Sequence, residues 1–503
     1  MTLSPDALRS SADTLIEAAG DAIDWTNVAR ESSPRLERES DSLIERLRRA
    51  RNLCRRLSKA TERPMAVGFF GLSQAGKSYL ISSLARGENG KLETVLDGEE
   101  LDFIDHINPP GGGKEATGLV TRFTRTPVAT APGFPVQLAL LSEADVVKIL
   151  GNSFFSDFDH EKVAFDPNAE ALRTLLNALG ACRQSERQGG LTEDDMVDIR
   201  DYFDKRFRKS MEALPADYWL VARDLAPYLS AADRAKLFAP LWGGFQEFAN
   251  AYLLLQKALE SLSFAPIVNA PIAALAQREG GQYVQTSSIM NVDAVRLRFG
   301  QDTDDTVLVA PVIDGAYAPA LPVPRSIIAA LTREMVCVLS RKPRADLLER
   351  VDLLDFPGYR GRVGLGSVSE AATEDKGSNP MGALFLRGKV ACLFERYTDD
   401  QEMNVLVLCN ASNEQINITD LGPVLDSWVW ATQGRNSSER ARRPPGLLYA
   451  LTKLDIRLSA NLNQTENNLD MSWSGMIDTV LLERFGKNEW VRRAVFAGEI
   501  PRK

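Results

Sequence analysis

A glycine-rich segment that lies between an apolar run and a helix-forming stretch has the residue types of a phosphate site. It reads Gly71-Leu72-Ser73-Gln74-Ala75-Gly76-Lys77-Ser78, a G-x-x-x-x-G-K-S pattern. In such a loop the backbone N–H groups can point at phosphate oxygens, and the positive end of the following helix faces the same anion. Lys77 can neutralise the outer phosphates, and the Ser78 hydroxyl can ligate Mg²⁺. We therefore predict that a nucleotide is bound by Gly71, Ser73, Gln74, Ala75, Gly76, Lys77, Ser78 and Tyr79.

A second motif, Asp355-Phe356-Pro357-Gly358, follows the apolar run 351–354. A carboxylate at the end of a buried strand, here Asp355, is well placed to hold Mg²⁺ through water. The backbone N–H of Gly358 could then contact a γ-phosphate. The alternative is an ordinary turn at the end of a strand, and we favour the functional interpretation.

A third motif, Thr452-Lys453-Leu454-Asp455, closes the predicted strand 447–451. The Asp455 carboxylate could accept hydrogen bonds from two guanine nitrogens that adenine does not offer as donors. The stem of Lys453 could lie flat over the base, and Thr452 begins the motif. These residues favour GTP and GDP over ATP, with a P-loop ATPase as the alternative.

The amino-acid composition restricts the classes of protein to which the chain can belong. The 503 residues are enough for about three domains, and 44% apolar with 25% charged residues is typical of globular proteins. The net charge of −9 argues against a nucleic-acid partner. Two histidines, His106 and His160, make a histidine-rich metal site improbable.

The cysteines and the N-terminus indicate a compartment. Five scattered cysteines without a C-x-x-C pair favour a reducing environment over a disulfide framework. The first residues lack the pattern of a secretory signal, and no apolar run is long enough to span a membrane. We expect a soluble cytoplasmic protein, with a peripheral membrane protein or an effector secreted without a classical signal as alternatives.

Hydrophobic periodicity predicts the order of elements. Residues 1–63 are expected to form helices with a turn near Ser32, and the second helix carries a basic face between Arg46 and Lys59. That face could bind an anionic membrane or an acidic partner. We favour instead a solvated face on a helix that packs against its own protein.

The remaining pattern predicts strands alternating with helices, which implies a mostly parallel sheet covered by helices on both faces. Residues 142–263 are mostly helical in this prediction. Strands are expected at 65–70, 295–299, 306–313, 351–355, 403–409 and 447–452, and helices at 79–85, 326–339, 384–398 and 474–485. The predicted division is an N-terminal helical segment (1–63), two parts of one α/β domain (64–141 and 291–503) and a mainly helical insertion (142–290).

The strings GLSQAGKS, LLDFPG and LYALTKLD, in that order, resemble the GTPase domain of the dynamin superfamily. The string ATGLVTRF at 116–123 resembles the switch-one segment of that family, which implies that Thr121, or alternatively Thr117, contacts Mg²⁺. Residues 108–115 together with VGFFGLSQAGKSYL resemble the bacterial virulence-effector family SrfC. The resemblance covers 65–123 and 351–455.

This resemblance implies a P-loop GTPase fold and in-line attack of water on GTP, with Lys77, Ser73, Gln74 and Thr121 as catalytic candidates. Dynamin-type loops carry glutamine where this chain has Ser73, and Gln74 follows one residue later. Slow or partner-stimulated hydrolysis that drives a conformational or mechanochemical switch is therefore expected. A nucleotide-dependent binding module, or a toxin or effector subunit with little turnover, is the alternative.

Other expectations concern partners and the chain ends. Arg360 and Arg362 could stabilise the transition state in cis or across a homodimer formed through the GTPase domain, although a surface role is favoured. Proteins of an effector complex and a membrane are further candidate partners. We find no final guanine-binding loop after Asp455, and we expect that the chain is truncated at its C-terminus.

Replacing Asp455 tests the choice of base. If the carboxylate accepts two hydrogen bonds from guanine, Asp455→Asn should shift binding from guanine to xanthine nucleotides, because xanthine presents a carbonyl oxygen where guanine presents an amino group. Competition binding with GTP and XTP would measure the shift. An unchanged preference for GTP would contradict the assignment of Asp455.

Overall fold

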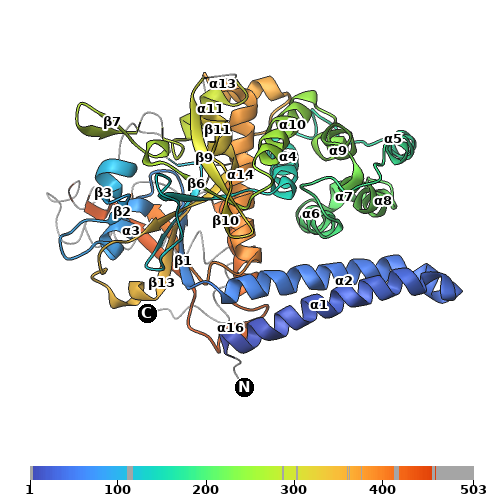
Figure 1. Ribbon diagram of the computed structural model, residues 1–503, viewed down its shortest axis with the longest axis horizontal. Helices are drawn as coiled ribbons and strands as arrows, with labels where there is room; N and C mark the ends of the chain where they lie inside the picture. The colour runs from blue at the N-terminus through green and yellow to red at the C-terminus, as the bar shows by residue number, and fades with distance from the viewer. Residues whose placement is uncertain are drawn as a thin grey trace, which may run out of the picture.

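The computed structural model describes residues 4–109, 117–285, 288–301, 304–359, 361, 363–374, 377–412, 418–455 and 459. It is an α/β structure in which helices pack on a large sheet, and a block of helices and a long helical hairpin extend from one side (Figure 1). The predicted helix at 474–485 lies outside the described residues.

Within these residues the central sheet has eleven strands in the order β10-β9-β6-β5-β12-β4-β13-β1-β14-β15, with β11 beside β9. The strands are β1 (Met65–Gly71), β4 (Val120–Thr124), β5 (Val136–Leu140), β6 (Ile267–Ala270), β9 (Thr306–Ile313), β10 (Ala316–Tyr317), β11 (Leu321–Pro324), β12 (Thr332–Val338), β13 (Val351–Asp355), β14 (Val405–Ala411) and β15 (Leu447–Thr452). Two small hairpins pair β2 (Glu93–Leu96) with β3 (Glu99–Asp102), and β7 (Gln277–Glu279) with β8 (Gln282–Val284).

The sheet is mixed, so the prediction of a mostly parallel sheet is wrong for one half of it. Strands β13, β1, β14 and β15 are mutually parallel. Beyond β13, strands β4, β5, β6 and β9 each form at least one antiparallel pair. The short link from β4 to β5, residues 125–135, contains a local turn closed by a bridge between Ala131 and Phe134. A short link reverses the chain, whereas a parallel connection needs a longer crossover.

The helices of the N-terminal half are α1 (Pro5–Ala29), α2 (Pro34–Thr61), α3 (Lys77–Ala85), α4 (Glu143–Asp157), α5 (Ala169–Ala181), α6 (Glu193–Arg206), α7 (Arg208–Met211), α8 (Tyr218–Leu225), α9 (Ala231–Phe238) and α10 (Gln246–Ser261). Later helices are α11 (Val292–Arg298), α12 (Arg325–Leu331), α13 (Ala371–Glu374), α14 (Pro380–Asp399), α15 (Ile418–Thr432) and α16 (Ser437–Arg440). We call α4–α10 the helical block. These helices confirm the prediction that residues 142–263 are mostly helical. The block lies between β5 and β6 in sequence, and both of these strands belong to the central sheet.

Two predicted elements are wrong. Residues 295–299 were expected to be a strand, but 295–298 belong to α11 and Phe299 is its C-cap, because the Asn291 side chain accepts a hydrogen bond from the N–H of Asp293 and begins a helix there. The expected helix 326–339 ends at Leu331, and the remainder is β12. Valines at 336 and 338 suit a central strand, and tertiary pairing with β4 and β5 overrides the helical pattern.

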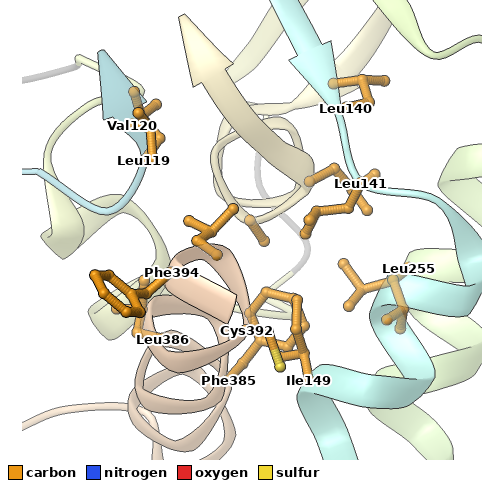
Figure 2. Close-up of a cluster of buried hydrophobic side chains, with 14 of the residues drawn as sticks. Leu119, Val120, Leu140, Leu141, Ile149, Leu255, Phe385, Leu386, Cys392 and Phe394 are labelled. Atoms are coloured by element: carbon orange, nitrogen blue, oxygen red, sulfur yellow. The ribbon is translucent and has the colours of Figure 1, made fainter. Parts of the chain in front are cut away.

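Helix α14 joins the sheet to the helical block. It crosses α4 at Gly388, where a Cβ atom would lie 2.4 Å from the carbonyl oxygen of Ile149, so only glycine allows this approach. The Ser153 hydroxyl donates to the carbonyl oxygen of Leu384 over 2.9 Å. Figure 2 shows the apolar core around this crossing, which includes Phe385 and Phe394 from α14.

The helical block is held together by a buried ion pair. The Arg234 guanidinium on α9 donates to both carboxylate oxygens of Glu143 on α4, over 3.0 and 2.9 Å. The Tyr252 hydroxyl on α10 donates to the same carboxylate over 2.6 Å. Because all three side chains are buried, this contact fixes α4, α9 and α10 relative to one another.

Helices α1 and α2 form an antiparallel hairpin, as predicted (Figure 1). The basic face of α2 packs against the helical block, which confirms the favoured alternative in part. It is only partly solvated, because Arg48, Arg51 and Arg55 all contact the Asp194 carboxylate and Arg49 contacts Asp201. Arg46 and Lys59 at its two ends are exposed. In the described part of the chain, no helix is both long and apolar enough to cross a membrane.

Lys389 on α14 offers a test of this packing. Its side chain is fully buried, and Nζ donates to the carbonyl oxygen of Ala329 over 2.9 Å. Burial lowers the pKa of Lys389 from 10.5 to about 7. Between these values the unfolded chain binds more protons than the folded protein, so folding stability should rise with pH.

Lys389→Met should remove this dependence. In the unaltered protein the free energy of unfolding is expected to gain up to about 1.4 kcal/mol per pH unit between pH 7 and 10 from this group. The variant should be more stable at pH 7 and lose that slope. Urea titrations at several pH values would measure both, and equal slopes in the two proteins would contradict the buried neutral amine.

Candidate functional site

Strand β1, the following loop and helix α3 form the predicted strand–loop–helix unit. Two glycines in it occupy positions that other residues cannot take without strain. Gly71 has φ +152°, and a Cβ atom there would lie 2.2 Å from the carbonyl oxygen of Cys409 on β14. Gly76, which precedes α3, has φ +79°. Gln74 also has a positive φ, 60°, so the loop bends sharply between β1 and α3.

Lys77 is the first residue of α3 and is only 7% exposed. Its Nζ donates to the carbonyl oxygen of Leu72 over 2.8 Å and lies 3.4 Å from that of Gly71. The ammonium group therefore lies against the loop that precedes it. An anion held by the loop N–H groups would be within reach of this charge, because Nζ contacts the loop itself.

The three predicted metal ligands come from neighbouring elements. The Ser78 hydroxyl donates to Oδ2 of Asp355 over 2.5 Å, and Asp355 at the end of β13 is 4% exposed. Thr121 on β4 is the register partner of Asp355 across the antiparallel pair. Opposed residues of an antiparallel pair share a face of the sheet, so their side chains are neighbours. The structure thus brings Ser78, Asp355 and Thr121 together.

The position of Thr121 differs from what the resemblance implies. It lies inside the buried strand β4 and not in a loop, and Thr117, the alternative, forms an isolated bridge with Asn291. Movement of Thr121 would therefore require movement of β4 itself. Among the residues that the structure describes, there is no group of three or more His, Cys, Asp and Glu side chains suited to a metal ion.

The segment after β13 follows the loop closely. The N–H of Phe356 donates to the carbonyl oxygen of Phe69 over 3.2 Å, and that of Tyr359 donates to Gly71 over 3.0 Å. Gly358 is buried between them. Arg360 and Arg362 lie outside the described residues.

Residues 452–455 reach the same edge from β15. The Thr452 hydroxyl donates to the carbonyl oxygen of Ala75 over 2.5 Å, which ties the end of β15 to the loop. Lys453 has φ +53°, and its carbonyl oxygen accepts a hydrogen bond from the Ser412 hydroxyl over 2.7 Å. Asp455, two residues after Lys453, is exposed, and so is Tyr79 on α3.

Sequence reasoning did not include the end of β14, which lies between β1 and β15. This end carries Cys409 and Asn410, and Ser412 directly follows it. The carbonyl oxygen of Asn410 lies 3.1 Å from the Thr452 hydroxyl oxygen. Burial raises the pKa of the Cys409 thiol to about 12, which favours the protonated thiol at neutral pH. In the sequence, the signal that could have identified these residues was their place at the end of the predicted strand 403–409.

The sheet and this edge define an α/β protein that carries a glycine-rich loop, a buried lysine and a Ser–Asp pair at the ends of its parallel strands. Residues 22–495 match the family described as "Putative bacterial virulence factor", so the chain belongs to that family. Its description names neither a nucleotide nor a reaction. A search of curated proteins found no match.

Substituting Gly71 tests the backbone contact that shapes the loop. In Gly71→Ala the added Cβ meets a main-chain carbonyl oxygen, so β1 and β14 must separate, at a cost of about 1–3 kcal/mol or more. Thermal unfolding should begin at a lower temperature. Gly180→Ala near the end of α5, where a Cβ atom meets nothing within 4 Å, is the matched control and should change stability by less than about 1 kcal/mol. Equal melting of both variants would contradict the contact.

Proposed function

We propose that this protein binds GTP and GDP with Mg²⁺ at the edge formed by β1, β13, β14 and β15, and hydrolyses GTP slowly or when a partner stimulates it. The observation that supports the proposal is the convergence of three motifs that lie far apart in sequence. Ser78 contacts Asp355, and Thr452 contacts Ala75, so the phosphate loop touches both of the other motifs directly. In this proposal the fold is a P-loop GTPase with a helical insertion.

The phosphates would lie in the loop at 71–78, against its N–H groups and the N-terminus of α3. Lys77 would exchange its hydrogen bonds with Leu72 and Gly71 for the outer phosphates. Mg²⁺ would bind the Ser78 hydroxyl and take most other ligands from phosphate and water, with Asp355 fixing a bound water. Such a site needs no cluster of acidic residues.

The base would lie beside Asp455, with the Lys453 stem against one face. Its support is the attachment of this segment to both β14 and the loop, through Ser412 and Thr452. A base contact fixed to the phosphate loop holds the two ends of a nucleotide at a constant separation. This arrangement favours binding of an intact nucleotide over binding of a free phosphate.

Hydrolysis would proceed by in-line attack of water on the γ-phosphate, with the developing charge met by Lys77, Mg²⁺ and backbone N–H groups. No covalent intermediate with the protein is needed. Ser73 and Gln74 flank the position of the attacking water in this proposal. Because Ser73 stands where the dynamin superfamily has glutamine, slow turnover is expected, and a binding module with little turnover remains the second candidate.

Calorimetric titration of the full chain with GTP, GDP and ATP in the presence of Mg²⁺ tests the proposal. We expect guanine-selective binding that falls at least tenfold in Lys77→Ala and in Asp455→Ala, because each removes a contact to one end of the nucleotide. Lys236→Ala, which removes an exposed lysine from α9, is the matched control and should bind like the unaltered protein.

Equal affinity for ATP and GTP would contradict the role of Asp455, and unchanged affinity in Lys77→Ala would contradict the phosphate site. Single-turnover measurement of bound GTP then separates the two candidates. GTP that stays intact for hours at every protein concentration would favour the binding module over the hydrolase.

A further inference from the structure

The segment that follows Gly358 connects the candidate site to the helical block. At its start, Tyr359 is hydrogen-bonded to Gly71 in the phosphate loop. Six residues later, Leu365 pairs with the end of α4. The N–H of Leu365 donates to the carbonyl oxygen of Asp157, and the N–H of Asp159 donates to that of Leu365, both over 2.9 Å. A parallel bridge therefore joins Leu365 to Phe158.

The connection is short and anchored on both sides. Six residues span at most about 20 Å, so the hydrogen-bonded ends at Tyr359 and Leu365 lie within that distance of each other. The Arg387 guanidinium on α14 donates to the carbonyl oxygen of Gly361 over 2.6 Å and lies 3.9 Å from the Asp157 carboxylate. Arg387 thus contacts both the segment and the end of α4 that it pairs with.

The bridge ends inside the packed interior of the helical block. Leu365 and Phe158 are both buried. The centroid of the Phe158 ring lies 5.4 Å from that of Phe245, the residue before α10, and 6.0 Å from that of Phe248 in α10. Because packed interiors shift between discrete arrangements and do not deform continuously, displacement of Phe158 requires α10 to move as well.

The middle of α4 cannot follow such a displacement freely. Gly388 and the hydrogen bond from Ser153 to Leu384 hold it against α14. Movement is therefore directed to the C-terminal end of α4 and the residues up to Val163. Lys162 Nζ lies 3.4 Å from the carbonyl oxygen of Gly364, so these residues also contact the segment.

From these contacts we infer that the helical block is the output element of the nucleotide site, coupled to it by the Leu365–Phe158 bridge with Arg387 as the positioning residue. This inference rests on the proposed function. Exchange of GTP for GDP changes the contact at Gly358, and the segment transfers that change to α4 and α10. Coupling is reciprocal: if the exchange of GDP for GTP changes the affinity of the helical block for a partner protein by some factor, that partner changes the ratio of the GTP and GDP affinities by the same factor.

Hydrogen exchange measured by mass spectrometry on the full chain tests the coupling, with GDP compared with a non-hydrolysable GTP analogue. In the unaltered protein, we expect the two nucleotides to give different protection at 154–165 and 245–262. In Arg387→Ala the difference should fall to less than half, while the affinity for each nucleotide stays within threefold. Leu365→Pro, which removes the N–H that donates to Asp157, should act in the same way.

Arg187→Ala is the matched control, because it removes an arginine that pairs with Glu193 in the same block without touching the segment. It should retain the full difference. If the unaltered protein binds both nucleotides but the block shows equal protection, the coupling is overturned and the proposed function stands. The coupling is also overturned if Arg387→Ala keeps the full difference. If neither nucleotide binds, the proposed function fails, and the coupling fails with it.

Discussion

The parallel register of β1 between β13 and β14 is the constraint on which the rest of the candidate site depends. It aligns Phe69 with Asp355 and Gly71 with Cys409, so these strands end at one edge. The close approach of Gly71 to Cys409 leaves no room for a side chain and fixes where the loop leaves the sheet. Ser78 and Thr452 can meet their partners only because the loop starts at that point.

A second level of organisation depends on α14. Its residues are buried on nearly all sides, which is expected of a helix that packs between a sheet and other helices. Glycine at 388 lets α4 approach its backbone, and Arg387, one residue earlier, contacts the segment that follows β13. The same helix therefore supports the sheet, the helical block and the connection between them.

Charge has a structural role on the opposite side of the sheet from the site. Successive residues of a strand face opposite sides, so Thr121 lies beside Asp355 while Arg122 enters a buried cluster with Asp352, Glu334 and Glu402. Burial alone would raise the pKa of Glu334, but the charges of Arg122, Arg333 and Arg63 lower it well below its usual value. Arg63, just before β1, reaches the same cluster through Glu402. The chain is thus joined to the sheet by an ion pair just after the helical hairpin, whereas the ion pairs along α2 join the hairpin to the helical block.

The sequence by itself determined the local features of this protein. Spacing of apolar residues and caps located the hairpin, β1, α3, the helical block, β13 and β15, because these depend on neighbouring residues along the chain. The glycines at 71 and 76 predicted a tight loop, and both have backbone angles that require it. The resemblance to bacterial virulence proteins was also contained in short strings, and the family match confirms it. The dynamin-like part stays a proposal.

Only the tertiary structure decided features that depend on residues far apart in sequence. Strand direction depends on how connections fold back, so the antiparallel half of the sheet was not evident from strands alternating with helices. From the sequence alone, the basic face of α2 could have faced solvent, a membrane or protein. The tertiary structure places Asp194 and Asp201 of the helical block against it. The Leu365–Phe158 bridge lies between two segments with no strand pattern, because a single pair of backbone hydrogen bonds leaves no periodicity in either sequence.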